Sequence, residues 1–149
     1  MTDTVTKKKR SEIMSKIRSK DTRPEMIVRK LLHAAGYRYR LHSKDLPGKP
    51  DLVLPKYRTV IFVHGCFWHQ HKGCSFAATP KSNVGYWSEK LASNRLRDAE
   101  STAILLKSGW RVLVVWECAC KSEKLASAIF SFLDNRSSPS NEIGFADLS

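Results

Sequence analysis

The sequence predicts an α/β fold in which a mixed β-sheet is flanked by helices. Apolar residues recur at helical spacing in three stretches, residues 24–35, 87–107 and 122–133. Runs of residues that favour β-strands occupy positions 37–41, 51–54, 58–64 and 110–116. The expected order is therefore helix, three strands, helix, strand, helix, which is typical of a sheet with helices packed on it.

The first helix has clear signals at both ends. Thr22 can cap its N-terminus, and Pro24 suits its first turn, where the missing N–H costs nothing. Gly36 provides the stop. The following strand, residues 37–41, alternates aromatic and basic side chains, so we expect it to be half exposed. A turn at residues 46–50 then leads into the next two strands.

The second half of the chain combines one long helix with one buried strand. Five residues of the long helix are expected to be buried: Leu91, Leu96, Ala99, Ala103 and Leu106. The apolar run WRVLVVW at 110–116 is typical of a strand buried on both faces. The last helix precedes a tail rich in Ser and Pro. We expect a basic arm at 1–20, one domain at 21–134 and a flexible tail at 135–149.

The chain is strongly basic. Its 149 residues include 26 Lys and Arg against 14 Asp and Glu, which gives a formal net charge of +12. Residues 1–40 hold 12 basic and four acidic side chains and so carry +8 of this charge. The densest cluster in this arm is Lys7, Lys8, Lys9 and Arg10. Such an arm is typical of a segment that contacts nucleic-acid phosphates or an anionic lipid surface.

The apolar segments and the cysteines of the chain indicate in which cellular compartment the protein works. No apolar run reaches the roughly 18 residues of a membrane helix, and no apolar stretch of a secretory signal follows the basic N-terminus. We therefore expect a cytoplasmic protein that does not bind to or span a membrane. In that reducing environment the cysteines at 66, 74, 118 and 120 suit metal binding or burial better than disulfides.

Cysteine and histidine are concentrated in one short segment. Two cysteines and two histidines that could bind a metal fall within residues 66–74, and Cys118 follows the buried strand. Zn²⁺ prefers four such ligands at the corners of a tetrahedron. Cys66, His71, Cys74 and Cys118 would form a closed, structural site, because no position is left for water. Cys120 also follows the strand, and spacing alone leaves it as an alternative to Cys118.

Three further residues are candidates for hydrolytic chemistry. Asp51 begins a strand, where its carboxylate could hold Mg²⁺, a cation that prefers oxygen ligands. The alternative is a turn, since Pro-Asp pairs are common in turns. His64 and His69 are not needed for zinc, and a histidine with a near-neutral pKa can take a proton from an attacking water.

Large aromatic residues occur in polar surroundings around the same segment. They are Phe67 and Trp68, followed by Tyr86 and Trp87 at the start of the long helix. On a basic protein, protruding rings can stack on bases or insert between base pairs. Alternatively, the rings pack around the zinc site.

Together these motifs resemble the very short patch repair endonucleases. The most specific strings are VIFVHGCFWH at 60–69 and GWRVLVVWEC at 109–118, and LPGKPD at 46–51 supports them. The remaining matches are Arg10, Ser11, Met14, Asp21, Thr22, Glu25, WSEK at 87–90, Asn94 and Asp98. The resemblance covers about residues 10 to 118. It departs from the family at Lys72 and Gly73, two residues where comparable members have one between the zinc histidine and the next cysteine.

The resemblance implies a restriction-endonuclease-like fold with a structural zinc site, and it implies roles for the candidate residues. Asp51 and the backbone carbonyl of Val63 would bind Mg²⁺. His69 would be the general base, with His64 and Glu25 in support. Structural zinc would be bound by Cys66, His71, Cys74 and Cys118. Phe67, Trp68 and Trp87 would open the duplex beside a mismatch, and Met14 with the basic arm would contact the minor groove.

The implied activity is hydrolysis of one DNA strand 5′ of the thymine in a T·G mispair, which arises when 5-methylcytosine deaminates. The implied partners are mismatched double-stranded DNA and, as a functional companion, a cytosine-5 DNA methyltransferase. We expect a monomer associated with the nucleoid of a bacterium. Two rival interpretations are a zinc-stabilised protein that binds mismatched or structured DNA without cutting it, and a nuclease with relaxed specificity.

Overall fold

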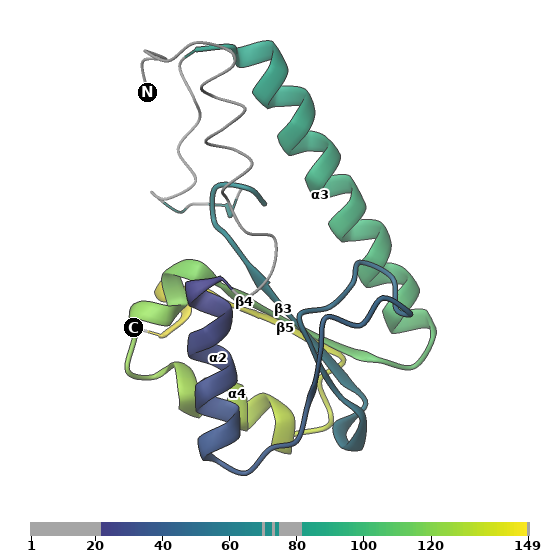
Figure 1. Ribbon diagram of the computed structural model, residues 1–149, viewed down its shortest axis with the longest axis vertical. Helices are drawn as coiled ribbons and strands as arrows, with labels where there is room; N and C mark the ends of the chain where they lie inside the picture. The colour runs from purple at the N-terminus through teal and green to yellow at the C-terminus, as the bar shows by residue number, and fades with distance from the viewer. Residues whose placement is uncertain (1–21, 70, 73, 75–81, 149) are drawn as a thin grey trace.

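The computed structural model describes residues 22–69, 71–72, 74 and 82–148 (Figure 1). These residues form one sheet with the strand order β1-β2-β3-β4-β5. Its strands are β1 (Arg40–Leu41), β2 (Leu52–Leu54), β3 (Thr59–His64), β4 (Arg111–Trp116) and β5 (Ser140–Ile143). β2 is antiparallel to both β1 and β3, whereas β4 is parallel to both β3 and β5. The predicted mixed sheet is confirmed.

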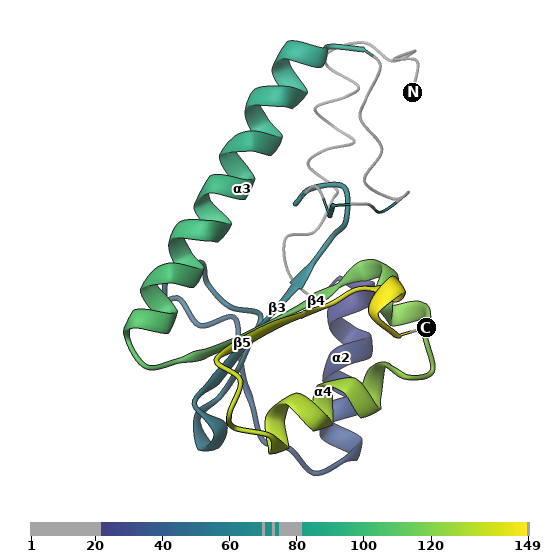
Figure 2. The same ribbon diagram turned by 180° about the vertical axis from the view of Figure 1, so that it is seen from behind.

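Helices cover both faces of this sheet. α2 (Arg23–Ala34) and α4 (Leu125–Asp134) pack on one face, and the C-terminal end of α3 (Val84–Lys107) packs on the other (Figures 1 and 2). Short 3₁₀ turns complete the described chain: η1 (Pro55–Tyr57), η3 (Glu117–Lys121) and η4 (Phe145–Leu148). Alternate residues of each inner strand face opposite layers, so β3 contributes Ile61 to the core under α2 and α4 and Phe62 to the core under α3.

Local sequence explains α2 and β4 directly. The Thr22 side chain accepts the N–H of Glu25 at 3.3 Å, and Pro24 lies in the first turn of α2. Gly36, just beyond the helix, has a positive φ of 86°, which glycine adopts without steric cost. All six residues of β4 are buried, as predicted, including the one charged residue, Arg111.

The long helix is less buried than its periodicity predicts. Leu91 is buried and Leu106 is partly buried, but Leu96, Ala99 and Ala103 are exposed, with Leu96 at 61%. Only the last turns of α3 lie over the sheet, where Leu105 and Leu106 pack on it, and the rest of the helix, with Leu96 and Ala99, extends beyond it (Figure 1). Periodicity identifies the helix but not how much of it meets the core.

The C-terminal segment differs from the expected flexible tail. Ser140–Ile143 forms the edge strand β5, parallel to β4, and Ile143 is buried in the core under α2 and α4. The sheet therefore continues past residue 134, the predicted end of the domain. Three of the four β5 residues are exposed. Apolar and polar residues therefore do not alternate along this edge strand, and the sequence gives no strand signal there. None of the described helices is long and apolar enough to cross a membrane.

Candidate active site and zinc centre

Two carboxylates and one imidazole meet where α2, the chain after β1 and the start of β2 come together. Glu25, His42 and Asp51 each offer a ligand atom, and these atoms lie within 4.8 Å of one another. Glu25, in the first turn of α2, is only 1% exposed, and its Oε2 lies 2.8 Å from Nε2 of His42. Asp51 Oδ2 accepts the backbone N–H of Val63 at 2.7 Å. The predicted residues Glu25, Asp51 and Val63 are therefore brought together.

The electrostatics of this cluster suit a divalent cation. Burial raises the pKa of Asp51 to about 7. The hydrogen bond from the Val63 N–H lowers this pKa, whereas the neighbouring Glu25 carboxyl raises it further. Glu25 is buried and Asp51 is half-buried, and two adjacent carboxyl groups with little access to water resist ionising together unless a positive charge lies nearby. Carboxylate oxygens are also the ligands that Mg²⁺ prefers. The donor set therefore fits Mg²⁺.

Two histidines and an aspartate form a second cluster. The rings of His64 and His69 stack in parallel, with their centroids 3.8 Å apart and their planes 3° apart. His69 Nδ1 lies 2.5 Å from Oδ2 of Asp98 on α3. If Nδ1 donates its proton to Asp98, Nε2 of His69 keeps the free lone pair and can accept a proton. In that tautomer, Asp98 fixes the orientation of the His69 ring.

His64 forms the inner side of this stack. It is 7% exposed, and burial lowers its pKa to about 3, with His69 contributing to the decrease. The ring is therefore neutral at physiological pH. Among the described residues, its Nδ1 is buried without a hydrogen-bond partner. His64 directly follows Val63 in β3, so the end of this strand joins the carboxylate cluster to the histidine cluster.

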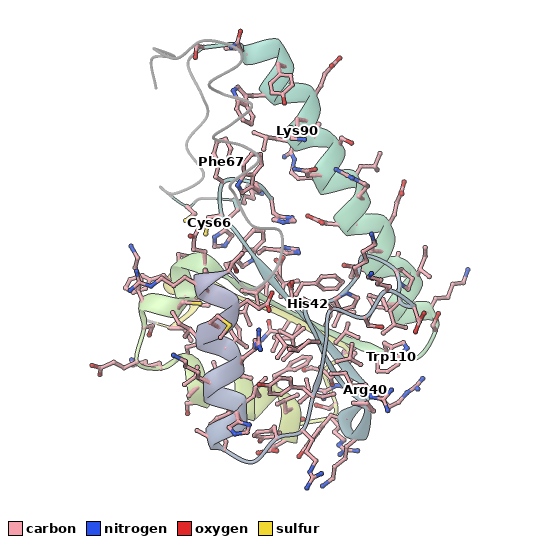
Figure 3. All side chains as sticks on the ribbon, viewed as in Figure 1. Arg40, His42, Cys66, Phe67, Lys90 and Trp110 are labelled. Atoms are coloured by element: carbon pink, nitrogen blue, oxygen red, sulfur yellow. The ribbon has the colours of Figure 1, made fainter. Side chains whose placement is uncertain are left out.

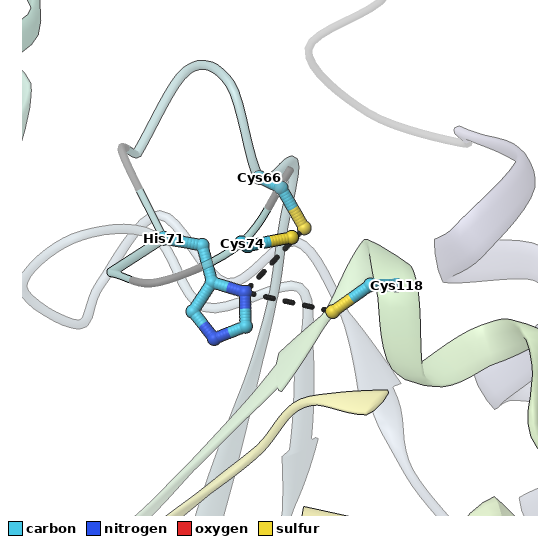
Figure 4. Close-up of side chains that lie close together, drawn as sticks. All are labelled: Cys66, His71, Cys74 and Cys118. Atoms are coloured by element: carbon cyan, nitrogen blue, oxygen red, sulfur yellow. Dashed lines mark hydrogen bonds between the residues drawn. The ribbon is translucent and has the colours of Figure 1, made fainter. Parts of the chain in front are cut away.

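The four predicted zinc ligands converge (Figure 4). Cys66, His71, Cys74 and Cys118 each offer a ligand atom within 4.8 Å of the others. His71 Nδ1 lies 3.7 Å from Cys66 Sγ and 3.5 Å from Cys118 Sγ. A tetrahedron with zinc bonds of about 2.3 Å to sulfur and about 2.0 Å to nitrogen places these two atom types about 3.5 Å apart. The separations therefore fit a Cys₃His zinc site, and the longer spacing at Lys72 and Gly73 does not prevent His71 from joining it.

The structure also distinguishes the two cysteines that follow β4. Cys120 lies apart from the cluster, and its Sγ contacts the backbone oxygen of Pro24 at 3.8 Å. Cys118 Sγ instead accepts the N–H of Phe145 at 3.3 Å. Burial raises the pKa of the Cys66 thiol to about 12, so a metal must displace a proton to bind there.

The indole of Trp116 connects the zinc centre to the histidine cluster. Its ring stacks on His71, with centroids 4.2 Å apart and planes 7° apart. Its edge also meets His64 at a centroid distance of 5.2 Å. The loop that carries Cys66, His71 and Cys74, here called the metal loop, is thus packed through His71 against Trp116. The same indole also contacts His64 of the two stacked histidines.

The predicted aromatic residues form one cluster at the N-terminal end of α3. Phe67 and Trp68 meet at 5.2 Å between centroids, and Trp87 lies 5.5 Å from Phe67 and 5.7 Å from Trp68. Trp87 is 7% exposed and Tyr86 beside it is 53% exposed. Asn94 donates to the backbone oxygen of Trp68 at 3.1 Å and so fastens the metal loop to α3. The rings pack on one another and not in the core of the sheet.

The predicted DNA contacts of the N-terminal arm lie outside the described residues. They are those of Met14, Lys7, Lys8, Lys9 and Arg10.

Comparisons with known proteins agree with this geometry. A family model described as DNA mismatch endonuclease Vsr matches residues 2–75. The chain is 56% identical over 118 residues to the type II nicking enzyme V.XorIIP of Xanthomonas oryzae pv. oryzae. The aligned region covers 79% of this chain and 86% of the relative. It is 43% identical over 126 residues to DNA mismatch endonuclease Vsr of Escherichia coli, covering 84% of this chain and 80% of the relative.

The chain belongs to the Vsr family of DNA mismatch endonucleases. As a Vsr-family member it is a DNA endonuclease. Its fold is similar to the catalytic domain of the homing endonuclease I-Bth0305I, with a TM-score of 0.53 and 22% identity, covering 79% of this chain and all of that one. The predicted restriction-endonuclease-like fold is confirmed.

The structure adds two residues to the site of this Vsr-family protein whose roles the sequence does not reveal. His42 lies 17 positions from its partner Glu25, and Asp98 lies 29 positions from His69. In the sequence Asp98 is visible only as part of a family motif on the long helix, without a role. His42 gives no signal, because an isolated histidine after a short strand has no spacing that relates it to Glu25.

Proposed function

We propose that this protein nicks one DNA strand 5′ of the thymine in T·G mispairs produced by deamination of 5-methylcytosine, and so starts very short patch repair. The observation that carries the proposal is the meeting, at the end of β3, of two carboxyl groups, buried Glu25 and half-buried Asp51, with a histidine that contacts Asp98. Its family and the mismatch named for the Escherichia coli relative support the same activity.

The roles of the chain's own residues follow from their positions. Asp51, with Glu25 beside it and the backbone carbonyl of Val63, would hold Mg²⁺, which when bound would neutralise charge developing on the scissile phosphate. His69 would take the proton of the attacking water at Nε2 while Asp98 keeps Nδ1 protonated. His64 would hold the His69 ring in place by stacking.

Mismatch recognition would come from the aromatic cluster and the basic arm. Phe67, Trp68 and Trp87 would insert beside the mispair, where less stacking and pairing must be broken than in paired DNA. Lys7, Lys8, Lys9 and Arg10 would contact phosphates, and Met14 the minor groove. Zinc bound by Cys66, His71, Cys74 and Cys118 would keep the metal loop folded without taking part in hydrolysis.

The proposal places the enzyme in the cytoplasm of a bacterium, acting as a monomer on the nucleoid. Its companion would be a cytosine-5 methyltransferase, because that enzyme creates the base whose deamination yields the substrate. The named relatives come from bacteria, which agrees with this setting.

The decisive experiment maps nicks on a set of duplexes. Purified protein and Mg²⁺ are incubated with end-labelled duplexes that carry each mispair in the same flanking sequence, with a fully paired duplex beside them. We expect one nick, 5′ of the thymine, in the T·G duplex. Equal cutting of paired DNA would support the relaxed nuclease, and tight binding to T·G without cutting would support the binding protein.

A further inference from the structure

His42 contacts both acidic residues of the site, Glu25 and Asp51. Its side chain reaches Glu25, with Nε2 and Oε2 2.8 Å apart, and its backbone N–H donates to the carbonyl oxygen of Asp51 at 3.0 Å. The pairing of Leu41 with Leu52 in the antiparallel β1–β2 ladder brings the two residues opposite each other. One residue thus joins the helix that carries Glu25 to the strand that carries Asp51.

The backbone of His42 adopts an unusual conformation at the position where it makes these contacts. Its φ of 46° lies in the left-handed region, which residues with a Cβ rarely adopt. Residues in such conformations concentrate at functional sites, where surrounding contacts hold them. In Figure 3 His42 lies toward the middle of the molecule, between Arg40 of β1 and the loop with Cys66 and Phe67.

His42 makes a short contact with the Glu25 carboxylate. That carboxylate is almost fully buried, and a buried carboxylate needs hydrogen-bond donors to stay in place. Arg29 Nη1 lies 3.5 Å from Oε2 of Glu25, whereas His42 Nε2 lies 2.8 Å from the same oxygen. Arg29 is on the same helix and lies one turn further along, so it cannot fix Glu25 relative to β2. His42 can, because it is bound to Asp51 through its backbone.

We propose that His42 is a positioning residue for hydrolysis, which holds the Glu25 carboxylate at a fixed place beside Asp51 so that the two can share one divalent cation. This inference rests on the proposed function. The imidazole acts through Glu25, whereas the proton of the attacking water goes to His69. Because the side chain is only partly buried, at 24% exposure, it can be replaced without opening a large cavity in the core.

The test compares His42→Ala with His42→Gln, whose amide N–H can reach Glu25 in the same way. We expect His42→Ala to lower the nicking rate at saturating DNA about 10- to 100-fold, the usual cost of losing a residue that orients a metal ligand. The dissociation constant for T·G DNA, measured with Ca²⁺ in place of Mg²⁺, should change less than about twofold because no DNA-binding ring or charge is removed. His42→Gln should recover most of the rate. His33→Ala, an exposed histidine on α2, is the matched control.

A second measurement does not depend on cutting. Mg²⁺ should raise the thermal midpoint of the wild type and of His42→Gln, and it should raise that of His42→Ala less at the same concentration. If His42→Ala nicks and responds to Mg²⁺ like the wild type, the positioning role is overturned. The same holds if His42→Gln stays folded but is as slow as His42→Ala. If the Mg²⁺ response depends on His42 as expected but the wild type never nicks T·G DNA, the proposed function alone is refuted.

Discussion

At the scale of single residues, the half-buried carboxyl of Asp51 links the stability of the protein to pH. Its pKa in the folded protein is about 7, above the 3.8 of the exposed group. The folded state therefore holds this proton more tightly than the unfolded state. The resulting stabilisation is complete below pH 3.8 and is lost as the pH rises through 7. Without a divalent cation, the folded protein at a pH of about 8 carries the full cost of an ionised Asp51 beside Glu25.

Replacing Asp51 with asparagine should separate stability from activity. Asp51→Asn removes the charge and keeps an oxygen to accept the N–H of Val63. Without metal at a pH of about 8, we expect its free energy of unfolding to exceed that of the wild type by about 1 to 3 kcal/mol, and the difference to vanish toward a pH of about 4. Nicking should be abolished while DNA binding remains. Urea unfolding at both pH values, with a nicking assay, checks this; a wild-type nicking rate would exclude Asp51 as a metal ligand.

The contact between His69 and Asp98 gives a second prediction. Asparagine at position 98 can donate to Nδ1 of His69, which would leave Nε2 protonated and unable to act as a base. Asp98→Asn should therefore slow nicking about 10²- to 10⁴-fold with little change in stability or DNA binding. Single-turnover nicking rates measure the effect, and Glu100→Gln, an exposed carboxylate on the same helix, is the control. A rate within threefold of the wild type would mean that Asp98 does not set the protonation of His69.

At the scale of elements, the cluster of Cys66, His71, Cys74 and Cys118 joins the loop after β3 to the end of β4, and zinc bound there should fasten the two together. Cys118→Ser should lose zinc and lower the free energy of unfolding by about 3 kcal/mol or more, because metal binding contributes directly to folding. Cys120→Ser should keep one zinc ion per chain and lose little stability, since Cys120 lies outside the cluster. Elemental analysis and denaturant unfolding of both variants test this, and freshly purified wild type without zinc would rule out the site.

Elements with strong local signals could be predicted from sequence, and those set by distant packing could not. The Thr22 cap, the stop at Gly36 and the apolar run of β4 each require only neighbouring residues, and all three are found in the structure. Most residues of β5 are exposed, and β5 forms because its backbone pairs with the free edge of β4. Likewise, the extension of α3 beyond the sheet depends on where the sheet ends, which helical periodicity does not reveal.

The same distinction applies to the candidate site. The zinc ligands within residues 66–74 are dense enough to be identified from spacing, and their convergence with Cys118 follows from the parallel pairing of His64 with Trp116. His42 and Asp98 bind residues on other elements through single side chains. A contact of that kind leaves no periodic or clustered pattern, so only the fold reveals it.

At the scale of the whole molecule, two separate features should determine DNA binding. The aromatic cluster of Phe67, Trp68 and Trp87 lies at one end of α3, where stacking on a base is worth roughly 1 to 3 kcal/mol and depends on how easily the base pair opens. The basic arm carries charge without large rings, so it should bind phosphates in any duplex. Mismatch preference and salt dependence should therefore change independently.

Binding to T·G and fully paired duplexes across a salt series, with Ca²⁺ present to prevent cutting, tests this separation. Trp68→Ala should reduce the preference for T·G and leave the dependence of log K on log salt nearly unchanged, because it removes no charge. Neutralising Lys7, Lys8, Lys9 and Arg10 should weaken both complexes equally and reduce the slope by about 0.9 for each phosphate that the arm no longer neutralises. Lys124→Gln, an exposed lysine just before α4, controls for net charge. If Trp68→Ala keeps the full preference for T·G, the ring serves to pack the zinc loop against α3 and another group reads the mismatch.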